Sequence, residues 1–261
     1  MSWPKPSWWG LTREDDPERP QFVPDARTHR GPDPRDGEAF GPSAMLALRG
    51  AVSDLSWLLG RGYAIVSAVK LVGDRWSLTE RQRLAVRRAA CSDNALAGRL
   101  ERRTAAADLD GRVLLIDGFN VVTTVEAALG GGVVLGCRDG TFRDIAGVHG
   151  TYRKVAETMP ALELIGARLW QLEVSQAGWL FDRPVSNSGR IQAMLRDAAK
   201  ASGWAWTVEL VDDPDLVLRN SEEVVATADS AILDHCQHWF NLARDVIETR
   251  CPAAAIVDLA S

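Results

Sequence analysis

The 261-residue sequence lacks any apolar run of about 18 residues, the length that a transmembrane helix requires. It also lacks a hydrophobic segment behind its N-terminus, so we expect no secretory signal. Its four cysteines stand far apart and form no CxxC pair, which argues against a disulfide framework and against a cysteine zinc site. Together these absences predict a cytoplasmic protein without a membrane partner.

The sequence also lacks two motifs, one for nucleotide binding and one for ester hydrolysis. The glycines at 130–132 precede an apolar strand and are not followed by Gly-Lys-Ser/Thr, which argues against a P-loop. No G-x-S-x-G stretch occurs, which excludes the hydrolase nucleophile elbow. Lysine is scarce, since only four of the 30 basic residues are lysine. Arginine favours planar partners such as phosphate, although genomic base composition can produce the same bias.

What is present is the composition of an ordinary globular protein, with 46% hydrophobic and 25% charged residues. The net charge of −5 is unevenly spread. Residues 42–104 carry 11 basic and 5 acidic side chains, whereas residues 105–261 carry 13 basic and 22 acidic ones. This asymmetry predicts a basic surface beside an acidic site.

The first 41 residues form the first of three expected parts. They hold seven of the 12 prolines and three tryptophans, Trp3, Trp8 and Trp9, without sustained periodicity. Such a composition is typical of a flexible arm. The tryptophans could dock on the body of the protein or on a protein partner.

A basic helical region is expected at residues 42–104. Apolar residues recur at 3- and 4-residue steps from Met45 to Leu59, and Ser77 with Glu80 fits a capping box for a following helix. Between residues 75 and 103 there are eight arginines and three acids. These arginines form either a solvated helical face or a surface for phosphates, in which Arg87 and Arg88 contact nucleic acid.

Residues 105–261 alternate strand and helix patterns, which predicts an α/β fold with an open, mostly parallel, three-layer sheet after the small helical region. An Asp-Gly pair at 139–140 predicts a hairpin. We expect one long helix at 230–248. The expected strands lie at 112–117, 133–137, 141–145, 172–181, 204–211, 224–228 and 254–259, with a further short strand at 216–219.

Three aspartates follow expected strands: Asp117, Asp182 and Asp229. In open α/β sheets functional groups collect beyond the C-terminal strand ends, so these side chains should converge. Three carboxylates that converge require a cation to offset their repulsion, and such oxygen ligands suit Mg²⁺ or Mn²⁺. A metal of this kind activates water for attack on a phosphodiester.

Each aspartate also has a purely structural explanation. Asp117 and Asp182 could start turns, and Asp229 is a good N-cap for the next helix. Function weighs more at Asp117, because the strand tip delivers a carboxylate and, through Asn120, an amide. Gly118 between them lets the backbone bend closely.

The stretch Ile116–Val121, with sequence IDGFNV, resembles the opening motif of PIN-like and NYN ribonuclease domains. In those domains an aspartate at the first strand's end and an asparagine three residues later help to bind the catalytic metal. The stretch ADSAILD at 228–234 is similar to their later acidic motif. The resemblance implies Asp117, Asp229 and Asp234 as metal ligands, with Asp182 as a further acid.

Residues 42–259 as a whole resemble a prokaryotic family, the domain of unknown function numbered four-three-four. The helical part carries the phrase LLGRGYAIVSAVKLVGDRWSLTERQRLAVRR, and the following part carries LLIDGFNV, RDIAGVHGTYR and ATADSAI. This resemblance implies a helical segment followed by a PIN-like unit.

Further candidates lie in and around residues 138–154. Four side chains there could bind phosphate or carry a proton, although the histidine could equally be structural; they are Arg143, His149, Tyr152 and Arg153. Glu126 could add a fourth carboxylate to the metal site or be a surface residue. His235 and His238 have a spacing compatible with zinc, but no second pair of ligands is evident.

These features favour a metal-dependent nuclease that acts on RNA, with Mg²⁺ or Mn²⁺ as the cofactor. Asp117, Asn120, Asp182 and Asp229 would form its catalytic site. One alternative is a nucleic-acid-binding module that keeps the fold without catalysis. Another is a protein-interaction component anchored by the N-terminal tryptophans.

Overall fold

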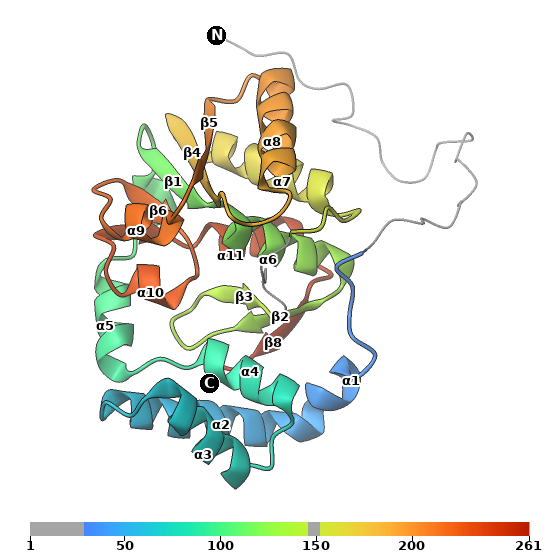
Figure 1. Ribbon diagram of the computed structural model, residues 1–261, viewed down its shortest axis with the longest axis vertical. Helices are drawn as coiled ribbons and strands as arrows, with labels where there is room; N and C mark the ends of the chain where they lie inside the picture. Colours follow the sequence, from blue (N-terminus) through green and yellow to red (C-terminus); the bar gives the residue numbers. More distant parts are fainter. Residues whose placement is uncertain (1–28, 146–151, 261) are drawn as a thin grey trace, which may run out of the picture.

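The computed structural model describes residues 29–145 and 152–260. Its N-terminal part is helical, as predicted, and Figure 1 shows these helices gathered at one end of the molecule. Pro42 stands at the first position of α2, where its missing N–H costs nothing. A capping box opens α4, but Thr79 and Gln82 form it in place of the predicted Ser77 and Glu80. The helices are α1 (Asp36–Ala39), α2 (Pro42–Gly60), α3 (Ile65–Arg75), α4 (Glu80–Ala89) and α5 (Asp93–Glu101).

The second part is an α/β unit built on a five-stranded parallel sheet, which confirms the predicted fold class at that level. The strand order is β5-β4-β1-β6-β7. Alternate residues of each strand face opposite sides of the sheet, and both sides are covered. The strands are β1 (Val113–Asp117), β4 (Gln176–Asp182), β5 (Trp206–Val211), β6 (Val224–Ala226) and β7 (His238–Phe240).

Helices pack on both faces of this sheet, in three layers. The larger core joins Leu114, Ile116 and Trp179 to four helices, and the smaller one joins Leu180 and Val225 to two short helices. On the first face lie α6 (Gly118–Gly130), α7 (Thr158–Gln171), α8 (Ser188–Ser202) and α11 (Leu242–Arg250); on the second lie α9 (Pro214–Arg219) and α10 (Ser230–Leu233).

A second, three-stranded sheet has the order β3-β2-β8. The predicted hairpin is confirmed: β2 (Val133–Gly136) and β3 (Phe142–Asp144) are antiparallel, and Gly140 in the turn has a φ of 77°. The predicted last strand is β8 (Ala255–Asp258), which pairs with β2 and not with the main sheet.

The helical region shares a hydrophobic core with this second sheet. Val133, Leu135 and Cys137 of the hairpin are buried together with Leu48 and Leu55 of α2. Figure 1 shows α2, α3 and α4 lying beneath β3, β2 and β8. The predicted boundary at residue 104 therefore does not separate two independent cores.

The predicted long helix at 230–248 is wrong. The chain forms α10, then the strand β7, then α11. Trp239 is fully buried in β7 and packs beside Cys236 and Leu233, while β7 pairs with β6. Burial of this side chain at the sheet thus outweighs local helical periodicity. The short strand expected at 216–219 is also wrong, since these residues belong to α9, which Asp213 caps.

Residues 29–41, which the composition assigned to the flexible arm, pack against the body. Arg30 Nε donates to Glu126 Oε2 at 2.8 Å, and His29 Nδ1 lies 2.7 Å from Glu157 Oε1. The described chain therefore contributes N-terminal residues to the α/β unit well before residue 42. Trp3, Trp8 and Trp9 lie outside the described residues.

Within the described ranges, no helix has both the length and the apolar character needed to cross a membrane.

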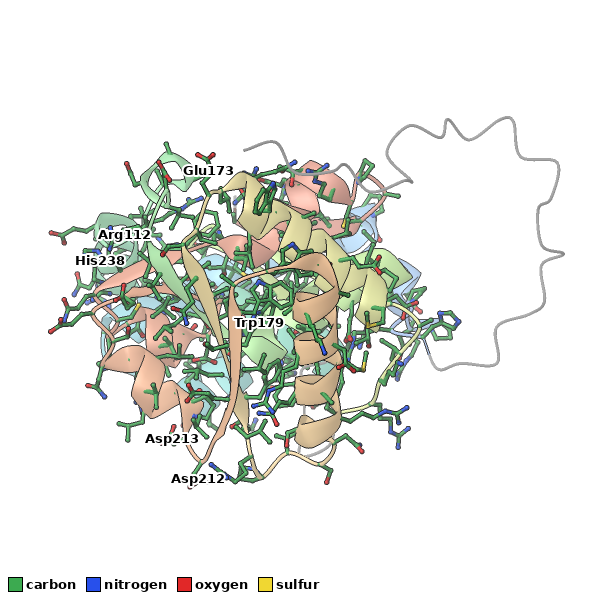
Figure 2. The ribbon with its side chains drawn as sticks, turned by 90° about the horizontal axis from the view of Figure 1, so that it is seen from above. Arg112, Glu173, Trp179, Asp212, Asp213 and His238 are labelled. Carbon is green, nitrogen blue, oxygen red and sulfur yellow. The ribbon has the colours of Figure 1, made fainter. Side chains whose placement is uncertain are left out.

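The parallel strands place their C-terminal ends at one edge of the sheet. In Figure 2, Arg112 and Glu173, which precede β1 and β4, lie at the edge opposite Asp212 and Asp213, which follow β5. From β1 the chain proceeds to β4 and β5 on one side, and later to β6 and β7 on the other. The order therefore reverses between β1 and β6, and ligands of open α/β sheets bind at such a point.

Candidate functional site

Asp117 ends β1 at this point of reversal, as the sequence predicted. The helix α6 begins at the next residue, Gly118. A Cβ on Gly118 would lie 2.4 Å from the ring of Phe181 in β4, so only glycine fits between the two strands. Asn120, one turn later, accepts a hydrogen bond at 2.9 Å from the backbone N–H of Ala228. The tip of β1 is thus tied to the loop after β6.

Thr227 makes a second tie between the same two segments. Its hydroxyl donates to Oδ2 of Asp117 at 2.7 Å and accepts from the backbone N–H of Asp229 at 3.0 Å. One side chain therefore sets the position of both acids. The backbone N–H of Asn120 is a further hydrogen-bond donor to the Asp117 carboxylate and lowers its pKa.

Burial, helped by the charges of Asp229 and Asp215, raises the pKa of Asp117 to about 7 against the opposing hydrogen bonds from Thr227 and the Asn120 backbone. A carboxyl group with this pKa titrates near neutral pH. A buried carboxyl beside other acids is a frequent property of functional sites, although structural networks also produce it.

Asp229 performs the structural role and still contributes its charge. Its Oδ1 accepts from the backbone N–H groups of Ala231 at 2.7 Å and Ile232 at 3.4 Å, which caps α10. Its negative charge raises the pKa of both Asp117 and Asp215. The two explanations of Asp229 offered by the sequence are therefore compatible.

Asp182 and Asp215 complete the cluster. Burial raises the pKa of Asp182, and Asp213 raises it further. Burial also raises the pKa of Asp215, as do Asp229, Asp182 and Asp213. Asp215 is not among the site residues that the sequence predicted. Its position a few residues beyond the expected strand at 204–211 was an available signal.

These acids have little compensation. In the part of the chain that the structure describes, neither Asp117 nor Asp182, Asp215 or Asp229 forms an ion pair. Arg183 binds Asp212 at 2.9 Å, outside the cluster. We call Asp117, Asp182, Asp213, Asp215 and Asp229 the acidic edge.

The carboxylate oxygens of the acidic edge are ligands that suit a hard cation such as Mg²⁺. Among residues 29–145 and 152–260, however, no three His, Cys, Asp or Glu side chains stand close enough together to hold a metal ion. Mg²⁺ often uses one or two carboxylates and completes its shell with waters and substrate phosphates. Asp117 and Asp229 fit that smaller requirement, since Thr227 bonds to both segments and Asp229 caps α10 through Oδ1 alone.

Asp234 and Arg143 are engaged inside the protein. Arg99 Nε donates to Asp234 Oδ1 at 2.8 Å. Arg143 is buried, and its guanidinium donates to the carbonyls of Ala228 and Arg88 and to Asp139 Oδ2, each at 2.6 Å. Asp234 and Arg143 are therefore bound to partners within the chain and are not offered to a metal or a phosphate.

Tyr152 and Glu126 form a buried pair. The Tyr152 hydroxyl donates to Glu126 Oε1 at 2.5 Å, and Thr158 donates to the same oxygen at 2.6 Å. Arg30 binds the other oxygen. Both carboxylate oxygens of Glu126 and the hydroxyl of Tyr152 are therefore bound within the protein, and neither side chain is available to a ligand.

Most arginines between residues 75 and 103 are likewise paired within the protein. Arg88, predicted to contact nucleic acid, donates to the carbonyl of Asp144 at 2.8 Å. Arg87 is exposed and has no described partner. The others with protein partners include Arg75 with Asp54, Arg81 with Asp36, Arg83 with Asp74, Arg99 with Asp139, and Arg102 with Leu233.

Arg153 is exposed, and the residue before it contacts the loop that follows Asp182. The backbone of its neighbour Tyr152 pairs with Ser186 at 3.1 Å and Asn187 at 2.9 Å, in the loop that follows Asp182. His149 falls outside the described residues.

The zinc spacing has no counterpart in the structure. His235 binds the carbonyl of Ala231, and His238 belongs to β7, so the two histidines do not share a helix.

Comparison with known proteins gives two family matches. Residues 106–245 match the family described as Domain of unknown function (DUF5616), and residues 47–102 match Protein of unknown function (DUF434). The predicted family four-three-four therefore covers the helical region, whereas the α/β unit matches a different family. An uncharacterized protein of Methanocaldococcus jannaschii is 29% identical over 205 residues, covering 78% of this chain and 98% of the relative. No solved structure matches the chain.

Proposed function

We propose that this chain, which belongs to the family described as Domain of unknown function (DUF5616), is a metal-dependent nuclease that hydrolyses phosphodiester bonds in RNA. One observation carries the proposal: the acidic edge. It collects carboxylates that follow β1, β4, β5 and β6, on either side of the point where the strand order reverses, without ion-pair partners in the described chain.

Asp117 and Asp229 would hold Mg²⁺ or Mn²⁺. When bound, such an ion lowers the pKa of water and neutralises charge on a phosphodiester. The uncompensated charge and raised pKa values of the acidic edge are what such a cation would relieve.

The remaining roles belong to the chain's own side chains. Thr227 and Asn120 orient the two metal-binding segments through bonds of 2.7 and 2.9 Å. Asp215 is exposed and has a raised pKa, so its carboxylate suits the removal of a proton from an attacking water. Arg153 would contact a phosphate near the loop after Asp182.

The resemblance of the stretch Ile116–Val121 to PIN-like and NYN ribonuclease domains supports RNA as the substrate. The matched family descriptions mention no activity. PIN-like character and the RNA substrate therefore remain part of the proposal.

A second candidate function is a nucleic-acid-binding module without catalysis. One observation favours it, since no three metal-binding side chains stand together in the described chain. The two candidates differ in whether Mn²⁺ binds at all.

The test combines thermal melting with RNA cleavage. A metal that binds the folded chain raises its melting temperature in proportion to the logarithm of metal concentration above Kd. We expect Mn²⁺ to stabilise the wild type and to support cleavage, and Asp117→Asn and Asp229→Asn to abolish both effects. Asp212→Asn, a neighbouring acid paired with Arg183, is the matched control and should retain both. Wild-type protein that shows neither stabilisation nor cleavage would leave only the binding module.

A further inference from the structure

A second concave site lies beside the strand β7, away from the acidic edge. It is a hollow of about 330 Å³ between the segment that follows α5 and the helix α11. One wall is fastened to the sheet, because the backbone of Arg103 bridges to Trp239 and the N–H of Thr104 donates to the Trp239 carbonyl at 2.8 Å. The size is at the lower end of the range for small-molecule sites.

Arg103 and Arg244 both line this hollow, and their guanidinium groups converge on Gly140 beside it. Nη1 of Arg103 and Nη1 of Arg244 lie 3.7 and 3.6 Å from the point where a Cβ on Gly140 would stand. Gly140 has a positive φ and no side chain, so the space between the two cations is left open. The sequence separation of these residues shows that only the fold brings the cations together.

Three contacts fix the position of the Arg244 guanidinium. Its Nη1 donates to the Gly140 carbonyl at 2.8 Å, its Nε pairs with Glu248 at 2.8 Å, and its guanidinium stacks 4.8 Å from the ring of Phe142. A fixed guanidinium loses little freedom when it binds an anion, which favours affinity.

Arg103 and Arg244 share the lining with two carboxylates, Asp245 and Glu248, and both carboxylates are already paired. Both nitrogens of the Arg168 fork bind Asp245, and Glu248 is occupied by Arg244. Arg103 stacks 5.8 Å from Trp239 and has no carboxylate partner in the described chain. The helix α11 begins here without a side-chain cap, which adds the positive end of its dipole.

Part of the remaining lining is apolar. Leu100 is 51% exposed, Ala105 and Ala106 lie beside it, and the buried Phe240 lies behind them. A ligand that satisfies both parts has an anionic group joined to a flat or apolar body.

We propose that this hollow binds a nucleoside monophosphate, with the phosphate between Arg103 and Arg244 and the nucleoside against Leu100 and Ala105. Two guanidinium groups match the doubly charged terminal phosphate better than a singly charged phosphodiester. The source is either a free nucleotide or the phosphorylated end of a strand. The inference goes beyond the proposed function, because it requires neither a metal nor the acidic edge.

The test is calorimetric titration of the full chain with adenosine 5′-monophosphate, adenosine and inorganic phosphate, in EDTA. We expect the monophosphate to bind more tightly than either fragment. Arg103→Gln should weaken its binding about tenfold or more, as the loss of a charge-assisted hydrogen bond does. Arg61→Gln is the matched control, since Arg61 is also exposed and stacks on a tryptophan, Trp57, and it should leave affinity unchanged.

Arg244→Gln should weaken binding as well, and its melting temperature reports whether the turn at Gly140 remains intact. The Arg103→Gln result stands without it, because that side chain makes no described hydrogen bond. In the Asp117→Asn background, short RNAs with a 5′-phosphate or 5′-hydroxyl distinguish the two sources. Binding of the phosphorylated strand alone identifies a strand end, and binding of the mononucleotide alone identifies a free ligand.

Three results would overturn the proposal: no binding of the monophosphate, equal affinity for inorganic phosphate, or affinity that Arg103→Gln leaves unchanged. A failed nuclease assay with intact monophosphate binding would refute the proposed function and leave this inference standing.

Discussion

The Thr227 hydroxyl lies 2.7 Å from Oδ2 of Asp117 and donates a hydrogen bond to it across two neighbouring strands. The hydroxyl oxygen of Thr227 also accepts a hydrogen bond from the backbone N–H of Asp229 at 3.0 Å. The bond to Thr227 lowers the pKa of Asp117 against the larger effect of burial. A single hydroxyl therefore couples the position of one acid to the ionisation of another.

Replacement of this hydroxyl by a methyl group in Thr227→Val should raise the pKa of Asp117 above its value of about 7. The lost bond should also cost about 1–2 kcal/mol of stability, because a buried acceptor loses its donor. NMR titration of the Asp117 carboxyl carbon measures the first effect and urea unfolding the second. Thr207→Val, at an exposed position of β5, should change neither. An unaltered Asp117 titration in Thr227→Val would show that the hydroxyl does not affect the pKa of Asp117.

Asp117→Asn should stabilise the metal-free protein above neutral pH. Burial raises the folded-state pKa to about 7 from 3.8, so ionisation destabilises the fold. The stability that protonated Asp117 contributes is present below pH 4 and is lost as pH rises to 7. In EDTA at pH 8 the variant should exceed wild type by at most about 4 kcal/mol, and the difference should shrink toward pH 4. A pH-independent difference would contradict the raised pKa.

Asp215→Asn should reduce RNA cleavage by about a hundredfold or more without loss of stability, because it removes the proposed proton acceptor and one repulsive charge. Its pKa is raised by burial and by Asp229, Asp182 and Asp213. Single-turnover rates with saturating Mn²⁺ measure the effect. Asp212→Asn should cleave like wild type, and equal rates for both variants would remove Asp215 from the mechanism.

Asp139→Asn should destabilise the protein by about 3–5 kcal/mol at pH 7, since it leaves two buried arginines without their shared carboxylate. Arg99 and Arg143 bind Asp139 at 2.5 and 2.6 Å. Burial alone would raise the pKa of Asp139, but Arg143, Thr141 and Arg99 lower it to about 2. This stability is present above pH 4 and is lost as pH falls to 2.

Urea unfolding at pH 7 and pH 3 measures the Asp139 effect, and the gap from wild type should narrow at pH 3. Asp93→Asn is the control, because the side chain of Asp93 is 87% exposed in its pair with Arg138 and should contribute less than about 1 kcal/mol. A similar cost for both variants would argue against a special role for the buried network.

A chain that starts at residue 42 should be less stable than one that starts at residue 29. The shorter chain lacks Arg30, which binds the fully buried Glu126 at 2.8 Å. Loss of the cation from a buried pair costs about 3–5 kcal/mol. Thermal melting of both chains, each with and without Glu126→Gln, measures the coupling. The substitution should cost less in the shorter chain, and additive effects would show that the pair contributes nothing.

Local pattern was enough to determine much of this molecule. Val113–Asp117 is a strand because a short apolar run is followed by Asp-Gly, and the hairpin forms at Asp139-Gly140 because glycine takes a positive φ there. Such features depend on neighbours in sequence, so the sequence alone reveals them.

The tertiary structure decided what depends on partners far along the chain. Trp239 turns a helical pattern into a strand because β6 offers it a buried place, and Asp215 joins the acidic edge because α9 packs across β1 and β4. Most arginines of the 75–103 region meet acids and carbonyls of the same chain, whereas Arg87 and Arg153 stay exposed. Arg103 and Arg244 converge on Gly140 from separate segments. A sequence displays the charge of each side chain, but the distance between charges, which sets their energy, exists only after folding.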